Sequence, residues 1–387
     1  MNALSRPALH RNFHRLAWFA LIMTAGTILF GAFVRLSDAG LSCPDWPTCY
    51  GKATWPQTQA EALQHVASEI RPLESHKAWR EQVHRFLAAF LGLEALTLAL
   101  LAARRRAHGA KQILGACALV ALGIPMYMAG HHAAATVLAV AGEAILLIAA
   151  WRWSNSDLSR VAVLTLAVVV FQAILGMWTV TWLLKPIVVM GHLLGGMALL
   201  SLLAWMAWKS IHLPITLAQA DSVRRWVIAG LVLLLTQIAL GGWVSANYAA
   251  LACGGSSMSV DNFPKCVGQW WPMQDYAEGF TLWRGIGVDY EGGILDGASR
   301  IAIQMAHRLM AVVVAIYLWI VAFRLFRVPG MKFWGSLVAV LVAVQVVLGV
   351  LNVKLAVPLA VAVAHVGGAV ALLFVLVTLL ARLRRPE

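Results

Sequence analysis

Ten apolar runs, each about as long as a bilayer-crossing helix, constrain this chain more than any other feature. Of its residues, 61% are hydrophobic and 12% are charged, against about 25% charged in a soluble domain. Backbone groups in lipid must be satisfied within their own segment, so each run predicts a helix. We therefore predict an all-α polytopic membrane protein, which excludes secreted enzymes, cytosolic enzymes and nucleic-acid binders. The runs lie near residues 17–36, 82–103, 112–128, 135–151, 161–183, 187–208, 226–246, 303–323, 335–353 and 358–381.

The positions of Lys and Arg predict how these spans are oriented. With the N-terminus inside, the cytoplasmic segments hold 18 of the 30 basic residues and only three acidic ones. The net charge of +13 is therefore a topology signal and not a nucleic-acid footprint. Arg35 and Leu36 follow the first run where a signal peptide would have small residues, so this run is predicted to remain as a span. We expect a multi-pass protein of a bacterial inner membrane with both termini in the cytoplasm.

Two long loops, near 37–80 and 247–302, are predicted on the outer, periplasmic side, where disulfides are chemically allowed. They hold four of the five cysteines, Cys43, Cys49, Cys253 and Cys266. These four form two loop disulfides or remain free or metal-binding thiols, although their spacing is not that of a zinc site. Cys117 lies within an apolar run and is interpreted as a small buried hydrophobe.

The chain repeats its landmarks in the same order. Gly31 and Gly241 each precede a cysteine by twelve residues, and a His-Arg pair opens the span after each long loop. The two halves point the same way, which indicates a parallel repeat about an axis along the membrane normal. The first half is longer by 50 residues between its two histidines, which we assign to a helical hairpin inserted at 112–151. The predicted domains are an N-terminal bundle over 1–215 and a C-terminal bundle over 216–387.

Four histidines occupy equivalent repeat positions, a few residues inside the outer ends of their spans. A single buried histidine is most simply a hydrogen-bonded helix contact, but two imidazoles at one depth are what a six-coordinate heme iron needs. We therefore predict one bis-histidine heme site in each half, with glycine pairs after His192 and His365 letting a flat macrocycle approach the backbone. The predicted pairs are His84 with His192 and His307 with His365.

Two arginines and two further histidines need separate interpretations. Arg85 and Arg308 each follow a candidate ligand, where they could pair with heme propionates or serve as interfacial anchors. His131 and His132 lie in the turn of the inserted hairpin and have no repeat partner, so we interpret them as solvated.

The halves differ beside the candidate ligands. Glu81 stands three residues before His84, whereas the neutral Gln304 stands three before His307. Positions i and i+3 share a helix face, so Glu81 is expected beside the first heme site, as a base or to stabilise a developing cation. The alternative is an interfacial glutamate paired with Arg80 or Arg85.

These features together resemble the heme A synthases over nearly the whole chain apart from about 107–155. The matching residues are the loop from Gly31 through Cys43 to Cys49, Glu81-x-x-His84-Arg85, Gly191-His192-Leu193, the stretch from Gly242 to Cys253, His307-Arg308, and His365. The resemblance implies two pseudo-symmetric four-helix bundles and eight spans, so the 112–151 hairpin is a departure from the family pattern.

The resemblance also implies an activity and its residues. Heme O would be oxidised at its C8 methyl to a formyl group, giving heme A for heme-copper cytochrome oxidase, with water as the oxygen source. His84 and His192 would hold the substrate heme, His307 and His365 a bound heme b, and Glu81 would be the catalytic carboxylate. The implied disulfides are Cys43–Cys49 and Cys253–Cys266. Implied partners are a heme O synthase that delivers the substrate, a membrane electron acceptor and a second copy of the chain in a homo-oligomer.

Two other functional classes share some of these features. A di-heme electron-transfer cytochrome b needs the same histidines without substrate exchange. A transporter built on repeats needs neither heme nor a catalytic carboxylate. The identity of the bound heme distinguishes the three.

Overall fold

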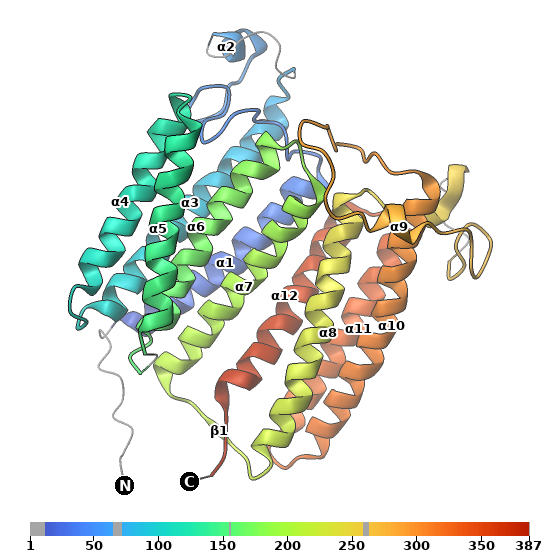
Figure 1. Ribbon diagram of the computed structural model, residues 1–387. Helices are drawn as coiled ribbons and strands as arrows, with labels where there is room; N and C mark the ends of the chain where they lie inside the picture. The colour runs from blue at the N-terminus through green and yellow to red at the C-terminus, as the bar shows by residue number, and fades with distance from the viewer. Residues whose placement is uncertain (1–11, 65–71, 155, 258–262, 387) are drawn as a thin grey trace. The chain divides into compact units, whose positions relative to one another are not determined.

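The structure, a computed structural model, describes residues 12–64, 72–154, 156–257 and 263–386. In these segments the chain forms helices and one two-stranded sheet (Figure 1). The elements are α1 Phe13–Leu36, α2 Gln59–Leu63, α3 Ser75–Ala103, α4 Gly109–Met128, α5 His132–Arg152, α6 Ser159–Thr181, α7 Pro186–Ile211, β1 Ile215–Thr216, α8 Ala220–Ala246, the 3-10 helix η1 Ala252–Ser257, α9 Tyr276–Gly279, α10 Gly297–Arg327, α11 Lys332–Lys354, α12 Leu359–Arg382 and β2 Leu383–Arg384.

Ten of the described helices are long and apolar enough to cross a membrane, and they coincide with the ten predicted runs. Large apolar side chains such as Ile22, Leu93 and Val312 point away from the protein, as expected where lipid surrounds a helix. Both helices of the inserted hairpin, α4 and α5, meet the same criteria. The prediction of an all-α polytopic membrane protein is confirmed.

The chain divides into two compact units that do not follow the predicted halves. The first comprises Met1–Gly26, Phe86–Ile174 and Ala198–Leu213, and the second comprises Thr27–Arg85, Leu175–Met197 and Pro214–Glu387. All four candidate heme ligands and all four loop cysteines therefore lie in the second unit. The domain boundary between 215 and 216 stays a prediction.

Close helix approach characterises the α4–α5 hairpin in the first unit. A Cβ atom built on Gly142 would lie 2.7 Å from the carbonyl oxygen of Ala116, so only glycine permits this contact. Beyond α5, Arg106 forms a 2.9 Å ion pair with Asp157. Burial opposes ionisation of Asp157, but hydrogen bonds from Arg106 and Ser159 keep its pKa below the ordinary value.

Four helices close a ring in the second unit: α8 packs on α10, α10 on α11, α11 on α12, and α12 on α8. In the first half, α1, α3, α6 and α7 have corresponding neighbours. A Cβ on Gly92 of α3 would contact Val169 of α6, and one on Gly196 of α7 would contact Ile28 of α1. The remaining neighbours, α1 with α3 and α6 with α7, meet at the candidate ligands described below.

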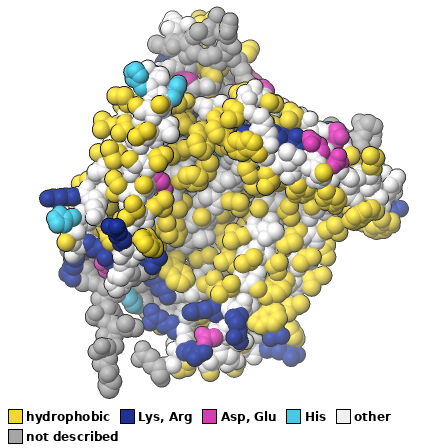
Figure 2. Space-filling view, in the orientation of Figure 1, with side chains coloured by type: hydrophobic (Ala, Val, Ile, Leu, Met, Phe, Trp, Pro, Cys, Tyr) yellow, Lys and Arg dark blue, Asp and Glu magenta, His cyan; other side chains and the backbone are white. Residues whose placement is uncertain are grey.

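Basic residues gather at one end of the helices in the second unit (Figure 2). Arg224 and Arg225 lie near the start of α8, Arg324 and Arg327 end α10, and Lys332 begins α11. The opposite ends of α8 and α10 are joined by the loop that holds Cys253 and Cys266. This separation is the one that the sequence predicts for cytoplasmic and outer ends.

Strands β1 and β2 tie the connection between the halves to the C-terminal segment. Ile215 pairs with Leu383 and Thr216 with Arg384 in parallel register. The pairing is extended by Arg224, which donates to the Leu383 carbonyl at 2.8 Å. We call this strand pair the C-terminal clasp.

The internal repeat is also visible in the backbone. Left-handed φ angles occur seven residues after Gly31 and Gly241, at Asp38 and Tyr248. They recur seven and eight residues after Gly176 and Gly349, at Leu183, Leu184, Ala356 and Val357. Such angles are unfavourable for residues other than glycine. Their recurrence at the same offsets indicates that the same turn ends equivalent helices.

Candidate functional site

Each candidate heme ligand lies against a glycine on the preceding long helix. A Cβ atom built on that glycine would approach the imidazole Cε1 to between 2.8 and 3.5 Å. The pairs are Gly31 of α1 with His84 of α3, Gly176 of α6 with His192 of α7, Gly241 of α8 with His307 of α10, and Gly349 of α11 with His365 of α12. The recurring unit is thus a pair of helices, one bearing glycine and the next bearing histidine, present four times.

The histidines come together in the two predicted pairs. His84 and His192 lie close enough to interact electrostatically, as do His307 and His365. All four side chains are half-buried. Two neutral imidazoles from neighbouring helices fit the ligand set of a bis-histidine heme. Among the described residues, no cluster of three or more His, Cys, Asp or Glu side chains could hold a metal ion.

The glycines that follow two of the ligands contact neighbouring helices. A Cβ on Gly368 would overlap Oε1 of Gln345, and one on Gly367 would contact Leu29. Gly196 similarly faces Ile28. These three glycines therefore face side chains of neighbouring helices, and the expectation that they admit a macrocycle stays a prediction.

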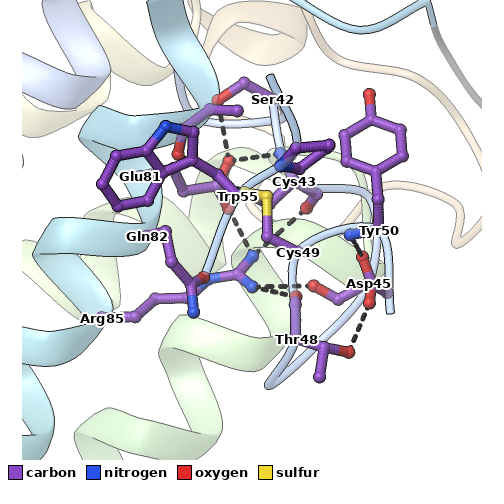
Figure 3. The surroundings of a disulfide bond; sticks show 12 residues. Ser42, Cys43, Asp45, Thr48, Cys49, Tyr50, Trp55, Glu81, Gln82 and Arg85 are labelled. Carbon is purple, nitrogen blue, oxygen red and sulfur yellow. Dashed lines mark hydrogen bonds and ion pairs between the residues drawn. A yellow bond between two sulfur atoms is a disulfide. The ribbon is translucent and has the colours of Figure 1, made fainter. Parts of the chain in front are cut away.

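Glu81 is buried near the start of α3, where the loop that holds Cys43 and Cys49 surrounds it (Figure 3). Its Oε2 accepts a 2.8 Å hydrogen bond from the Cys43 backbone N–H and another from the Ser42 hydroxyl at 3.2 Å. Its Oε1 lies 2.5 Å from Nη2 of Arg85. The carboxylate is therefore fixed one helical turn before His84 by backbone, hydroxyl and guanidinium groups.

Arg85 is hydrogen-bonded to the same loop. Besides Glu81, its guanidinium donates to the carbonyl oxygens of Thr48, Asp45 and Cys43 at 2.6, 2.8 and 3.2 Å (Figure 3). The ion pair that the sequence offered as the alternative for Glu81 is therefore present. Arg85 positions the carboxylate, and the predicted propionate contact finds no support in its partners.

Arg308 differs from Arg85. It makes one 3.4 Å hydrogen bond to the Lys265 carbonyl and lies over the ring of Phe263. Within the described parts of the chain, its buried Nε and Nη2 have no hydrogen-bond partner. Unsatisfied guanidinium nitrogens beside a ligand fit a carboxylate such as a heme propionate.

Gln304 occupies the place of Glu81 in the second half and is buried as well. Its Oε1 has no hydrogen-bond partner among the described residues. The two halves therefore differ at this position in charge, as the sequence predicts. They also differ in whether the side-chain oxygens are hydrogen-bonded by the described residues.

The structure joins Cys43 to Cys49 and Cys253 to Cys266 and leaves Cys117 unpaired, all five being described. After the second cysteine of each loop come two residues with left-handed φ, Tyr50-Gly51 and Val267-Gly268. Cys49 and Cys266 each form an isolated bridge with the residue three positions later. The underlying motif, aromatic-Pro-x-Cys-x-Gly, was missed in the sequence although both copies are readable there.

The loop between α8 and α10 also contacts the turn between α6 and α7. Tyr290 is 1% exposed, packs with Leu41 and Leu184, and donates its backbone N–H to the Leu183 carbonyl at 3.1 Å. Nearby, the Lys185 ammonium lies 3.4 Å from the ring centroid of Trp283. Burial lowers the pKa of this lysine. No single sequence motif indicates this contact, because it joins segments that are far apart in the chain.

Two glutamines beside the ligands were also missed. Gln237 and Gln345 stand four residues before Gly241 and Gly349, and both contact the neighbouring histidine. Gln172 holds the same place before Gly176. The signal that could have found them is the Gln-x-x-x-Gly spacing, which occurs in three of the four helix pairs.

Comparison with known proteins places these features in a family. The family model described as "Cytochrome oxidase assembly protein" (COX15-CtaA) matches residues 14–130 and 126–377. A heme A synthase of Shewanella oneidensis is 36% identical over 372 residues, covering 94% of this chain and 96% of that protein. Heme A synthases of Caulobacter vibrioides and Paracoccus denitrificans are 26% and 28% identical, covering 95% and 91% of this chain and 96% and 82% of theirs.

Proposed function

This chain belongs to the heme A synthase family, and from that premise we propose that it oxidises the C8 methyl group of heme O to the formyl group of heme A. The observation that carries the proposal is the asymmetry between two otherwise equivalent histidine pairs. Glu81 lies beside the first pair and the neutral Gln304 beside the second. One pair is thus equipped for chemistry on its ligand and the other for retaining a cofactor.

In this proposal His84 and His192 bind the substrate, and His307 and His365 hold a heme b. Arg308 fits a propionate of the heme b through its unsatisfied nitrogens. The heme b, when bound, accepts or relays electrons. A membrane or protein acceptor then receives them, and a heme O synthase supplies the substrate.

The overall reaction requires a methyl group and one water to become a formyl group, releasing four protons and four electrons. It proceeds as two successive two-electron oxidations. Glu81 lies where a carboxylate can stabilise positive charge developing at the reacting carbon or take a proton from the attacking water. Ser42, Cys43 and Arg85 hold its oxygens in place, so its geometry is set before substrate arrives.

The test is the identity of the bound hemes. We expect acid extraction and chromatography of the purified protein to yield heme b together with heme O or heme A. Two tightly held b hemes without heme O or A would instead indicate an electron-transfer cytochrome. Absence of any heme spectrum, combined with flux of a solute across vesicles, would indicate a transporter.

A further inference from the structure

Gln237 on α8 is the described side chain that contacts the ring of His307. Its Nε2 lies 3.1 Å from Nδ1 of His307, 3.4 Å from Nε2 of the same ring and 3.2 Å from the His307 backbone carbonyl, so Nδ1 is the nearer of the two ring nitrogens. The amide is supplied four residues before Gly241, whose missing side chain lets the imidazole lie against α8. The same stretch of α8 therefore makes room for the His307 ring and places an amide beside it.

The other three candidate ligands lack such a contact. Among the described residues, the buried Nδ1 atoms of His84, His192 and His365 have no hydrogen-bond partner. Gln345 comes nearest, but its Nε2 donates to the His365 backbone carbonyl at 2.9 Å and lies 3.5 Å from Nε2 of the ring. Buried Nε2 of Gln172 has no partner in the described segments. Within the described segments, His307 is thus the one ligand of the four whose Nδ1 lies within hydrogen-bond distance of a side chain.

This contact has a chemical consequence if His307 binds iron, which rests on the function proposed above. An imidazole that binds metal through Nε2 carries its proton on Nδ1 and almost always donates it to an acceptor. Gln237 presents Nε2 to this position, while its own Oε1 is buried without a partner among the described residues. Rotation about the last side-chain torsion, which has a broad and roughly two-fold profile, exchanges these two atoms. The exchange gives up the hydrogen bond that Nε2 donates to the His307 backbone carbonyl and gains the one from Nδ1–H.

We propose that Gln237 is a positioning residue for the heme of the second half, and that its Oε1 accepts the Nδ1–H hydrogen bond of iron-bound His307. This bond fixes the ring with Nε2 toward the iron. It also raises the basicity of the ligand, which favours the ferric state and lowers the midpoint potential. The heme of the second half is thereby held asymmetrically, with one ligand supported at Nδ1 and the other not.

Two substitutions test the proposal in full-length protein carrying His84→Ala and His192→Ala, which leaves only the second pair. Gln237→Leu removes the acceptor and should raise the midpoint potential. Gln237→Glu retains an acceptor and removes the donor, so it should lower the potential. The readouts are a redox titration and the low-spin electron paramagnetic resonance spectrum. Loss of the acceptor should also weaken heme retention by about 10–100-fold.

Gln345→Leu is the matched comparison, because it removes an amide that contacts the other ligand through its backbone carbonyl. We expect its shift in potential to be smaller than that of Gln237→Leu. The proposal is overturned if both Gln237 variants keep the parental potential and spectrum. It is equally overturned if Gln237→Glu shifts the potential in the same direction as Gln237→Leu, since Gln237 would then act as a donor.

Two further outcomes remain decisive. If Gln237→Leu no longer holds heme, retention by Gln237→Glu supports the acceptor role and loss by both variants refutes it. Absence of heme from the parental protein would instead refute the proposed function of the second pair. The two failures are therefore distinguishable.

Discussion

Glu81 and Gln304 show how a single side chain can make two equivalent sites differ in charge and hydrogen bonding. Both are buried three residues before a candidate ligand, but the carboxylate accepts hydrogen bonds from its loop, whereas Oε1 of Gln304 has no partner among the described residues. Arg85 belongs to this arrangement, because its guanidinium joins Glu81 to three loop carbonyls. A change at either residue therefore acts on the outer loop as well as on the charge beside the ligand.

Substitution of Glu81 by glutamine should remove the charge while keeping the volume of the side chain. We expect heme O to accumulate and heme A formation to fall by about 10²–10³, the usual cost of losing one well-placed electrostatic group. Heme extraction from cells lacking their own synthase measures it. Gln304→Glu is the control and should leave the reaction in place. Normal conversion by Glu81→Gln would mean that the carboxylate has only a structural role.

Removal of either ligand in the second half should abolish the low-spin spectrum of heme b. His307→Ala or His365→Ala takes away one of two axial ligands, and the iron becomes five-coordinate or is lost. The measurement is the optical difference spectrum of purified protein. His131→Ala, at an exposed histidine of the α4–α5 turn, should leave it unchanged. A normal spectrum in both ligand variants would place the heme elsewhere.

Among the helices, the recurring element is a glycine-bearing helix followed by a histidine-bearing one. The sequence shows all four glycines and all four histidines, because their offsets repeat. It does not show that each glycine touches its histidine, since in two cases a long loop of irregular length separates them. The contact follows from hairpin packing, which repeat offsets alone do not specify.

Gly31 and Gly176 provide a matched test of this contact in the first half. A Cβ on Gly31 would lie 2.8 Å from Cε1 of His84, whereas one on Gly176 would lie 3.5 Å from Cε1 of His192. Gly31→Ala should therefore displace its ligand and reduce the heme O and A recovered by extraction. Gly176→Ala, with ordinary van der Waals contact, should retain them. Equal heme content in the two variants would contradict the model of a tight glycine–histidine contact.

The outer loops show the limits of sequence reasoning at the scale of elements. Cysteine positions and the resemblance predict the pairings that the structure contains. The packing of Tyr290 against Leu41 and Leu184 was not predicted, because it depends on how a loop of one half folds over the other. The use of Arg85 by its loop was missed for a different reason, because its acceptors are backbone carbonyls, which leave no trace in the residue pattern.

Peptide mapping under non-reducing conditions tests the loop pairings. We expect peptides linked through Cys43–Cys49 and Cys253–Cys266, with Cys117 alkylated as a free thiol after unfolding. Reduction before digestion is the control and should release all linked peptides. A native bridge to Cys117 would contradict both the pairing and its location within the apolar helix α4.

For the whole molecule, charge predicts the orientation in the membrane. Basic residues lie at the helix ends opposite the cysteine loops, and such residues are retained on the cytoplasmic side. We expect a fluorescent-protein fusion after residue 387 to be bright, and an alkaline phosphatase fusion at the same site to be inactive. Fusions within the outer loop near residue 270 should give the reverse. An active phosphatase at the C-terminal position would overturn the predicted orientation.

The C-terminal clasp has a consequence for synthesis of the protein. Leu217 donates its backbone N–H to the Arg384 carbonyl at 3.0 Å. The segment between the halves therefore pairs with residues that are synthesised 167 positions later. At about 5–20 residues per second, translation needs roughly 8–33 s to supply them. During that interval the later spans are synthesised while this strand pairing cannot yet form. The clasp can therefore form only after His307 and His365 have been synthesised, which makes it one of the last contacts available to the chain.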